Sequence, residues 1–125
     1  MPANVRRASS VSEIFTVITH PGGDDDVERA GLYVLERHNS LQGALRLVEL
    51  LRAEFHKLDT LPDGHRKVVG EFVRQPYVRP WRDYLIYHEV YEQENVVRVL
   101  YVWHARRSSR PNFGRQHDPL PEALP

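Results

Sequence analysis

The sequence predicts an α+β fold with an N-terminal strand, an antiparallel two-helix hairpin and then a three-stranded antiparallel sheet. Three observations support this β-α-α-β-β-β order. A β-branched and aromatic run comes first, two stretches with apolar residues at helical spacing follow, and two β-rich runs then flank a polar turn. We expect the helical hairpin to pack on one face of the sheet, because each element has to bury its apolar side.

The first strand is expected within residues 13–19. Glu13–Thr19 reads EIFTVIT, which is rich in β-branched and aromatic residues. The tetrapeptide His20-Pro21-Gly22-Gly23 ends this strand. Residues 1–12 are polar and small, and we expect them to form a flexible lead-in.

The first helix is expected to begin in the acidic run Asp24-Asp25-Asp26. Asp25 and Glu28 have the spacing of a capping box, and carboxylates suit the positive end of the helix dipole. A metal site is the alternative, but it would need further carboxylates or histidines to converge there. The apolar positions of this helix are Val27, Ala30, Gly31, Val34 and Leu35.

The second helix is expected over about Leu41–Leu58, after a break at Asn39-Ser40. The short connection favours an antiparallel hairpin. Turn residues at Leu61-Pro62-Asp63-Gly64 end the helix. Its expected buried stripe consists of Leu41, Ala44, Leu45, Val48, Leu51, Phe55 and Leu58.

The rest of the domain is predicted to be a sheet. Lys67–Arg74 is a short strand, whereas Tyr84–Tyr91 and Val96–His104 form a hairpin around a four-residue polar turn. Alternation divides the first hairpin strand into two sets, only one of which faces the helices. We favour Leu85 and Tyr87 as core and Tyr84 and His88 on the open face, with the reverse assignment left open.

The predicted domain spans residues 13–110, and residues 111–125 contain four prolines and are expected to form a flexible tail. The 125 residues are 41% hydrophobic and 27% charged, which is typical of a globular protein. There are no cysteines, which suits a reducing cytoplasm, and we expect no membrane segment. We also expect no cofactor and no metal, because phosphate-binding and zinc-binding spacings are missing.

Charge is unevenly distributed although the formal net charge is +0. Residues 64–115 contain ten cations and five anions, so this part has a net charge of +5. A zero total argues against a general nucleic-acid binder. The basic half is nevertheless compatible with one anionic partner surface.

A family resemblance rests on three blocks: GALRLVELLRAEFHKLDTLPDGHRK, FVRQPYVRPWRDYLIYHEV and VVRVLYVWHARR. Within them lie a Leu-Pro-Gly break (Leu61, Pro62, Gly64, more closely spaced than the family's), a Tyr-Leu-Ile-Tyr strand from Tyr84, and a strand end that reads His-Ala-Arg-Arg from His104. Over about residues 14–110 the chain resembles the RelE/ParE toxin superfamily, and specifically its ParE-like branch, often labelled plasmid stabilisation proteins.

The resemblance implies the toxin of a bacterial type II toxin–antitoxin module, acting in the cytoplasm and held in a hetero-oligomer by a cognate antitoxin. ParE-like members inhibit DNA gyrase by binding. We therefore expect contacts with a protein partner through cationic, aromatic and histidine side chains. The expected set is Arg74, Arg79, Trp81, Tyr84, His88, Arg106, Arg107 and Arg110.

RelE-like members instead cleave messenger RNA in the ribosome, and this is the alternative function. The expected catalytic set is then His104, Arg106, Arg107 and Arg82. Tyr84 stands where such enzymes commonly have an arginine, and Phe113 lacks the hydroxyl of their C-terminal tyrosine. These departures favour the binding inhibitor. A third interpretation is a degenerate member that only pairs with its antitoxin.

Overall fold

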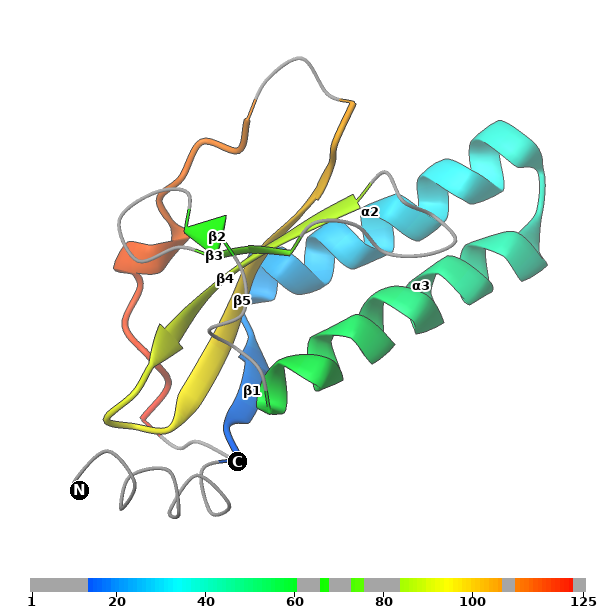
Figure 1. Cartoon of the computed structure of the whole chain (residues 1–125). Helices are drawn as coiled ribbons and strands as arrows, with labels where there is room; N and C mark the ends of the chain where they lie inside the picture. The colour runs from blue at the N-terminus through cyan, green and yellow to red at the C-terminus, as the bar shows by residue number, and fades with distance from the viewer. Residues whose placement is uncertain (1–13, 61–65, 68–72, 76–83, 107–109, 123–125) are drawn as a thin grey trace.

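The computed structural model describes residues 14–60, 66–67, 73–75, 84–106 and 110–122. A two-helix hairpin and a sheet form the body of the molecule (Figure 1). The elements are β1 (Thr16–Thr19), α2 (Pro21–His38), α3 (Leu41–His56), β2 (Arg66–Lys67), β3 (Val73–Gln75), β4 (Tyr84–Tyr91) and β5 (Val96–His104). Their order confirms the predicted α+β class. None of the helices in the described ranges is long and apolar enough to cross a membrane.

The sheet has the strand order β1-β5-β4-β3-β2 and is mixed. Strand β1 pairs parallel to β5, with Thr16 opposite Val96, whereas β2 to β5 pair antiparallel along the sheet. The sheet is therefore not purely antiparallel, because the helical hairpin crosses over one face and lets β1 join β5 at the edge. The single strand expected at Lys67–Arg74 is replaced by the two short strands β2 and β3.

Helix α2 begins at Pro21, before the acidic run, so the capping box predicted at Asp25 and Glu28 is wrong. The N-cap is His20, whose Nδ1 accepts a hydrogen bond from Gly22 N at 2.9 Å. Proline is favoured at the first helical position because it has no N–H to satisfy and its φ angle is already helical. Asp24 lies in the first turn and pairs with Arg52 of α3 at 2.7 Å.

Helix α3 buries most of the predicted stripe, with two exceptions at its N-terminal end and one addition, Leu47. Ser40 caps it by accepting from Gly43 N at 2.9 Å, and Ala44, Leu47, Leu51 and Phe55 are buried. Leu58 is buried in the 3-10 turn that follows. Leu41 and Leu45 were expected in the core, but 61% and 58% of their surface is exposed. Leu45 and Leu47 both fit a helical spacing with the shared positions, and only packing on the sheet selects between them.

The two faces of the sheet carry separate apolar clusters. Tyr84 and Ile86 pack with the helices, whereas Tyr87 and Tyr101 pack together on the outer face. The favoured assignment of faces was therefore wrong, and the reverse is observed. Tyr87 pairs with Tyr101 while His88 pairs with Val99, so Leu100 is an extra residue that forms a β-bulge in β5.

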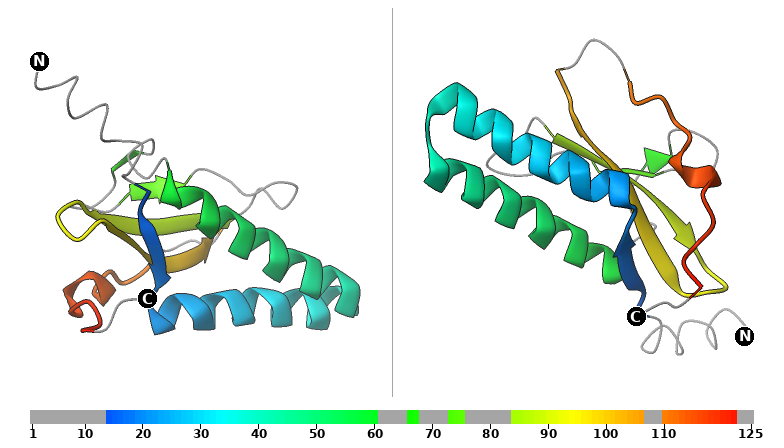
Figure 2. Two further views of the ribbon diagram at one scale, coloured as in Figure 1. Left: turned by 90° about the horizontal axis from the view of Figure 1, so that it is seen from below. Right: turned by 180° about the vertical axis from the view of Figure 1, so that it is seen from behind.

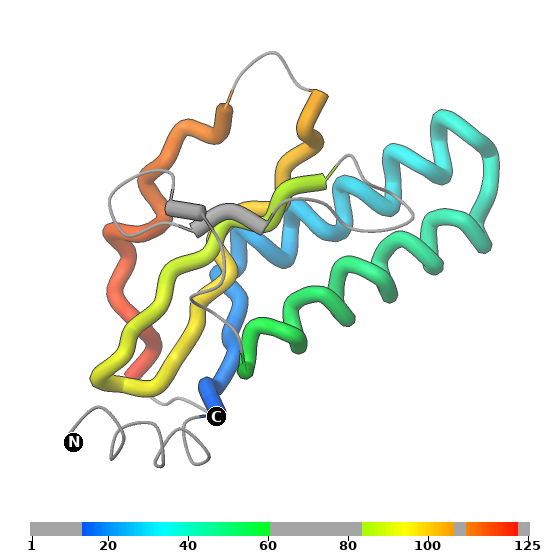
Figure 3. The backbone as a smooth tube through the Cα atoms, in the orientation of Figure 1, coloured from blue at the N-terminus to red at the C-terminus, as the bar shows by residue number. Residues whose placement is uncertain are grey.

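Residues 110–122, which we call the strap, run along the outer face of the sheet. The sheet thus lies between the helical hairpin and the strap (Figures 2 and 3). Phe113 packs against Tyr87 and Tyr101, with ring centroids 5.2 and 5.5 Å apart. The sequence predicts a flexible tail over residues 111–125, whereas residues 112–119 are in contact with the sheet. Side chains of the sheet form hydrogen bonds with the main chain of this segment, and its prolines do not prevent these bonds.

Candidate functional site

A groove of about 690 Å³ opens between α2 and the C-terminal end of β5. It exists because β1 ends at Thr19 while β5 continues to His104, so the last residues of β5 have no neighbouring strand on that side. Helix α2 takes the place of that strand. The groove is lined by residues that include Arg29, Tyr33, Glu36, Tyr84, Trp103, His104 and Arg106.

The floor of the groove contains a buried carboxylate, Asp26. Its Oδ2 accepts hydrogen bonds from Val102 N at 3.0 Å and from Arg115 Nη1 at 2.8 Å. Arg29 Nη1 lies 3.7 Å from the other oxygen. Asp26 thus satisfies a β5 amide that has no strand partner and compensates the charge of Arg115.

Sequence reasoning missed the role of Asp26 because it treated the three aspartates as one capping run. A signal was present in the helical spacing. Asp26 lies four residues before Ala30 and next to Val27, which places it within the buried stripe.

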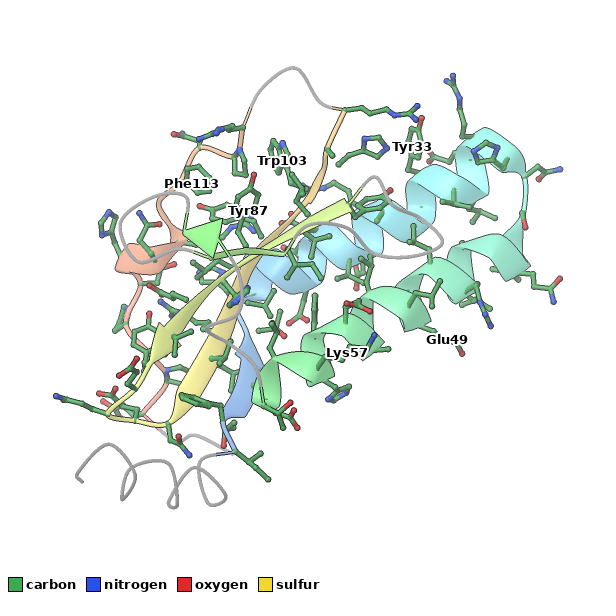
Figure 4. All side chains as sticks on the ribbon, viewed as in Figure 1. Tyr33, Glu49, Lys57, Tyr87, Trp103 and Phe113 are labelled. Atoms are coloured by element: carbon green, nitrogen blue, oxygen red, sulfur yellow. The ribbon has the colours of Figure 1, made fainter. Side chains whose placement is uncertain are left out.

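The walls of the groove combine aliphatic, aromatic and cationic side chains. Leu32 and Tyr33 of α2 are about half exposed, at 53% and 48%, and Trp103 of β5 is partly buried (Figure 4). Arg29 and Arg106 are exposed. Aromatic residues and arginine are enriched at protein interfaces, because they combine a large contact area with directional hydrogen bonds.

His104 lies at the end of β5 and is held by its neighbours. Its Nδ1 accepts from Arg106 N at 3.2 Å, and its ring meets the edge of Tyr84 with centroids 5.1 Å apart. This is the backbone-bonded role common for a strand-end histidine. It leaves only Nε2 for proton transfer.

The structure brings together three of the residues predicted from the sequence. Tyr84, His104 and Arg106 all line the groove. His88 is fully buried, so it presents no surface in this structure for the contact predicted with a partner. Arg110 is exposed at the start of the strap, and Arg74 lies in β3. Arg79, Trp81, Arg82 and Arg107 lie outside the described residues.

A second polar cluster, also missed from the sequence, lies on the outer face of the sheet. Arg98 is only 3% exposed, and its Nη2 pairs with Glu89 at 3.0 Å and bonds to Tyr91 Oη at 2.9 Å. Tyr91 also donates to Glu89. Burial raises the pKa of the Tyr91 hydroxyl well above its usual range, and the neighbouring Glu89 carboxylate adds to this rise.

Among the described residues, no three histidine, aspartate or glutamate side chains come together in a way that would hold a metal ion. Asp24 and Asp26 instead form ion pairs with Arg52 and Arg115.

A family model described as "ParE toxin of type II toxin-antitoxin system, parDE" matches residues 17–109. The chain belongs to the ParE toxin family. A solved structure titled "Chromosomal ParDE TA system from P. aeruginosa" shares the fold, with a TM-score of 0.66 at 10% identity. That match covers 75% of this chain and 99% of the other. A comparison with curated proteins finds no match.

Membership of the ParE family confirms the resemblance read from the three sequence blocks. The groove, Asp26 and the Arg98 cluster all lie within the matched range. The strap lies beyond it, although its side chains and main chain contact the matched part of this ParE-family chain.

Proposed function

We propose that this ParE-family protein is a toxin that acts by binding a target protein, DNA gyrase, and that a cognate antitoxin neutralises it in the cytoplasm. The family match over residues 17–109 carries the proposal. The groove supports it, since its half-exposed Tyr33 and its exposed arginines Arg29 and Arg106 are side chains suited to a protein partner.

The antitoxin assignment rests on the same family and on the basic half of the sequence. A toxin with ten cations against five anions over residues 64–115 favours an acidic partner segment, which charge would steer to the surface. The printed title of the solved neighbour names a ParDE system, which is consistent with a two-protein module.

The experiment is a supercoiling assay with purified gyrase and the full-length protein. We expect inhibition that increases with protein concentration and is reversed by the antitoxin encoded beside this gene. Supercoiling that stays unchanged at large excess of protein, in a host that nevertheless stops growing on induction, would reject gyrase as the target.

Messenger RNA cleavage remains a second candidate because His104 and Arg106 line the same groove. An arginine would stabilise developing phosphate charge, and His104 Nε2 would be the available acid or base. A translation extract supplies the test. Cleavage linked to ribosomes and abolished by His104→Ala supports the nuclease, whereas intact message at growth-arresting concentrations removes it.

A further inference from the structure

The edge of the sheet beyond the end of β1 is closed by two side chains. Strand β1 ends at Thr19, whose partner on β5 lies just before the bulge at Leu100. Past that point, Arg115 Nη1 donates to Leu100 O at 2.7 Å. Two residues further along β5, Asp26 Oδ2 accepts from Val102 N at 3.0 Å. The two side chains therefore satisfy main-chain groups of β5 that β1 does not reach.

The same two side chains form an ion pair with each other. Arg115 Nη1 donates to Asp26 Oδ2 at 2.8 Å, and the side chains are only 24% and 4% exposed. A charge-assisted hydrogen bond is stronger than one between neutral groups, and water screens it little at this burial. Because Asp26 belongs to α2, this ion pair holds the beginning of the helix against β5 from the strap.

The guanidinium of Arg115 fits its position because Gly22 has no side chain. A Cβ atom at Gly22 would lie 2.4 Å from Cζ of Arg115, which is closer than two carbon atoms can approach. The guanidinium also lies over the ring of Tyr101, with Cζ 4.2 Å from the centroid. The first turn of α2 and the outer face of the sheet thus both contact the same cation.

A second arginine, Arg29, stands beside the same carboxylate. Its Nη1 lies 3.7 Å from Asp26 Oδ1, which is too far for a hydrogen bond, and its side chain is 66% exposed in the groove wall. Arg115 has the shorter contact and already compensates the buried charge. Without Arg115, Arg29 would be the remaining ion-pair partner of Asp26 within the described residues, and attraction to the buried carboxylate would draw it away from the groove edge.

We propose that Arg115 is a positioning residue for the groove: it fixes Asp26 on β5 and thereby keeps Arg29 exposed for the target. This inference rests on the proposed function, in which the groove contacts the target protein. Arg115 does not line the groove and lies beyond residue 109, where the family match ends. It acts on binding through Asp26.

A first experiment measures the position of Asp26 by amide hydrogen exchange of the full chain. Arg115→Met removes the ion pair, and Gly22→Ala displaces the guanidinium while alanine favours the helix. In both variants, exchange at Val102 should become at least about tenfold faster relative to exchange at Val97 in the same strand. Gly114→Ala is the matched control, because the added methyl group would meet no atom closer than 3.8 Å, and it should leave the ratio unchanged.

A second experiment is a double-mutant cycle on the protein concentration that half-inhibits gyrase supercoiling. In the wild-type background, Arg29→Ala should raise this concentration by about tenfold. In the Arg115→Met background, the same change should alter it by less than about twofold, because Arg29 is already drawn to Asp26. A merely structural role of Arg115 would instead give additive effects. If Arg115→Met does not fold, Gly22→Ala takes its place in the cycle.

Two results would overturn the proposal. One is an unchanged exchange ratio at Val102 in both Arg115→Met and Gly22→Ala, and the other is additivity in the cycle. Failure of the proposed function is seen separately, since it appears as a wild-type protein that leaves supercoiling unchanged. The cycle is then run on the expression level that arrests growth, with the same two expectations, and the exchange ratio is read without any target.

Discussion

At the residue scale, the most consequential side chain is the buried carboxylate of Asp26. It joins three parts of the molecule, since it lies on α2 and binds the β5 amide of Val102 and the strap residue Arg115. Removing a partner from such a group leaves a buried donor and a charge without compensation.

We expect Asp26→Ala to lower the free energy of unfolding by about 2–4 kcal/mol, because Val102 N and Arg115 both lose their acceptor. Asp25→Ala is the matched control. Asp25 is exposed on the same helix, so its change should stay within about 0.5 kcal/mol. Urea unfolding followed by circular dichroism measures both, and equal effects would show that the Asp26 contacts contribute nothing.

A pH effect is expected at Asp118. Its carboxylate accepts from His20 Nε2 at 2.6 Å, and this hydrogen bond lowers the pKa of Asp118 below its ordinary value of 3.8. Because the folded pKa lies below the unfolded one, the stabilisation is present above pH 3.8 and is lost as the pH falls through the lowered pKa.

The melting temperature of wild type should therefore exceed that of Asp118→Asn at neutral pH, and the difference should shrink below about pH 4. Glu122→Gln, an exposed change in the same strap, serves as the control and should show no such convergence. A difference between wild type and Asp118→Asn that persists unchanged at pH 2 would argue against the His20 contact as its source.

At the element scale, α3 shows that helical spacing alone does not identify the buried side. Leu47 is fully buried against the sheet, whereas Leu45, two positions earlier on the same helix, is 58% exposed. The prediction from the sequence had selected Leu45. The physical reason is that the α2 contact and the sheet contact together fix the rotation of α3.

Substitution separates these two leucines. Leu47→Ala should cost about 2–5 kcal/mol of unfolding free energy, because it leaves a cavity in the core. Leu45→Ala should change it by no more than about 0.5 kcal/mol. Chemical denaturation of the two variants measures the difference directly. A larger loss of unfolding free energy for Leu45→Ala than for Leu47→Ala would contradict the burial of Leu47.

At the scale of the whole molecule, the groove between α2 and β5 is an accessible surface with the exposed cations Arg29 and Arg106 at its edge. Charge reversal at Arg106 should weaken binding to an acidic partner by about tenfold or more, through the loss of a contact of about 1.4 kcal/mol. Arg46→Glu changes the same charge at an exposed position of α3 that does not line the groove.

Growth on induction compares the two variants. We expect Arg106→Glu to require more expressed protein for growth arrest, and Arg46→Glu to behave like wild type. Equal toxicity of both variants at matched expression would show that Arg106 at the edge of the groove does not contribute to binding the target.

The order of elements and the family were both readable from the sequence. Runs such as EIFTVIT and YLIYHEVY, together with the helical spacing of Val27, Ala30 and Val34, identify strands and helices because local periodicity reflects the side that each element buries. The match to the ParE family agrees with the three blocks quoted for the resemblance.

Only the tertiary structure decided which side of each helix and strand is buried. Period-2 alternation fits either face of β4, so the burial of Tyr84 and His88 depended on the packed helices and on the bulge at Leu100. The contacts of Asp26 with Val102 and with Arg115 join residues 76 and 89 positions apart in the chain, and no local pattern encodes such pairs. The sequence by itself thus determined the family and the order of elements, whereas long-range packing decided the groove, the buried charges and the position of the strap.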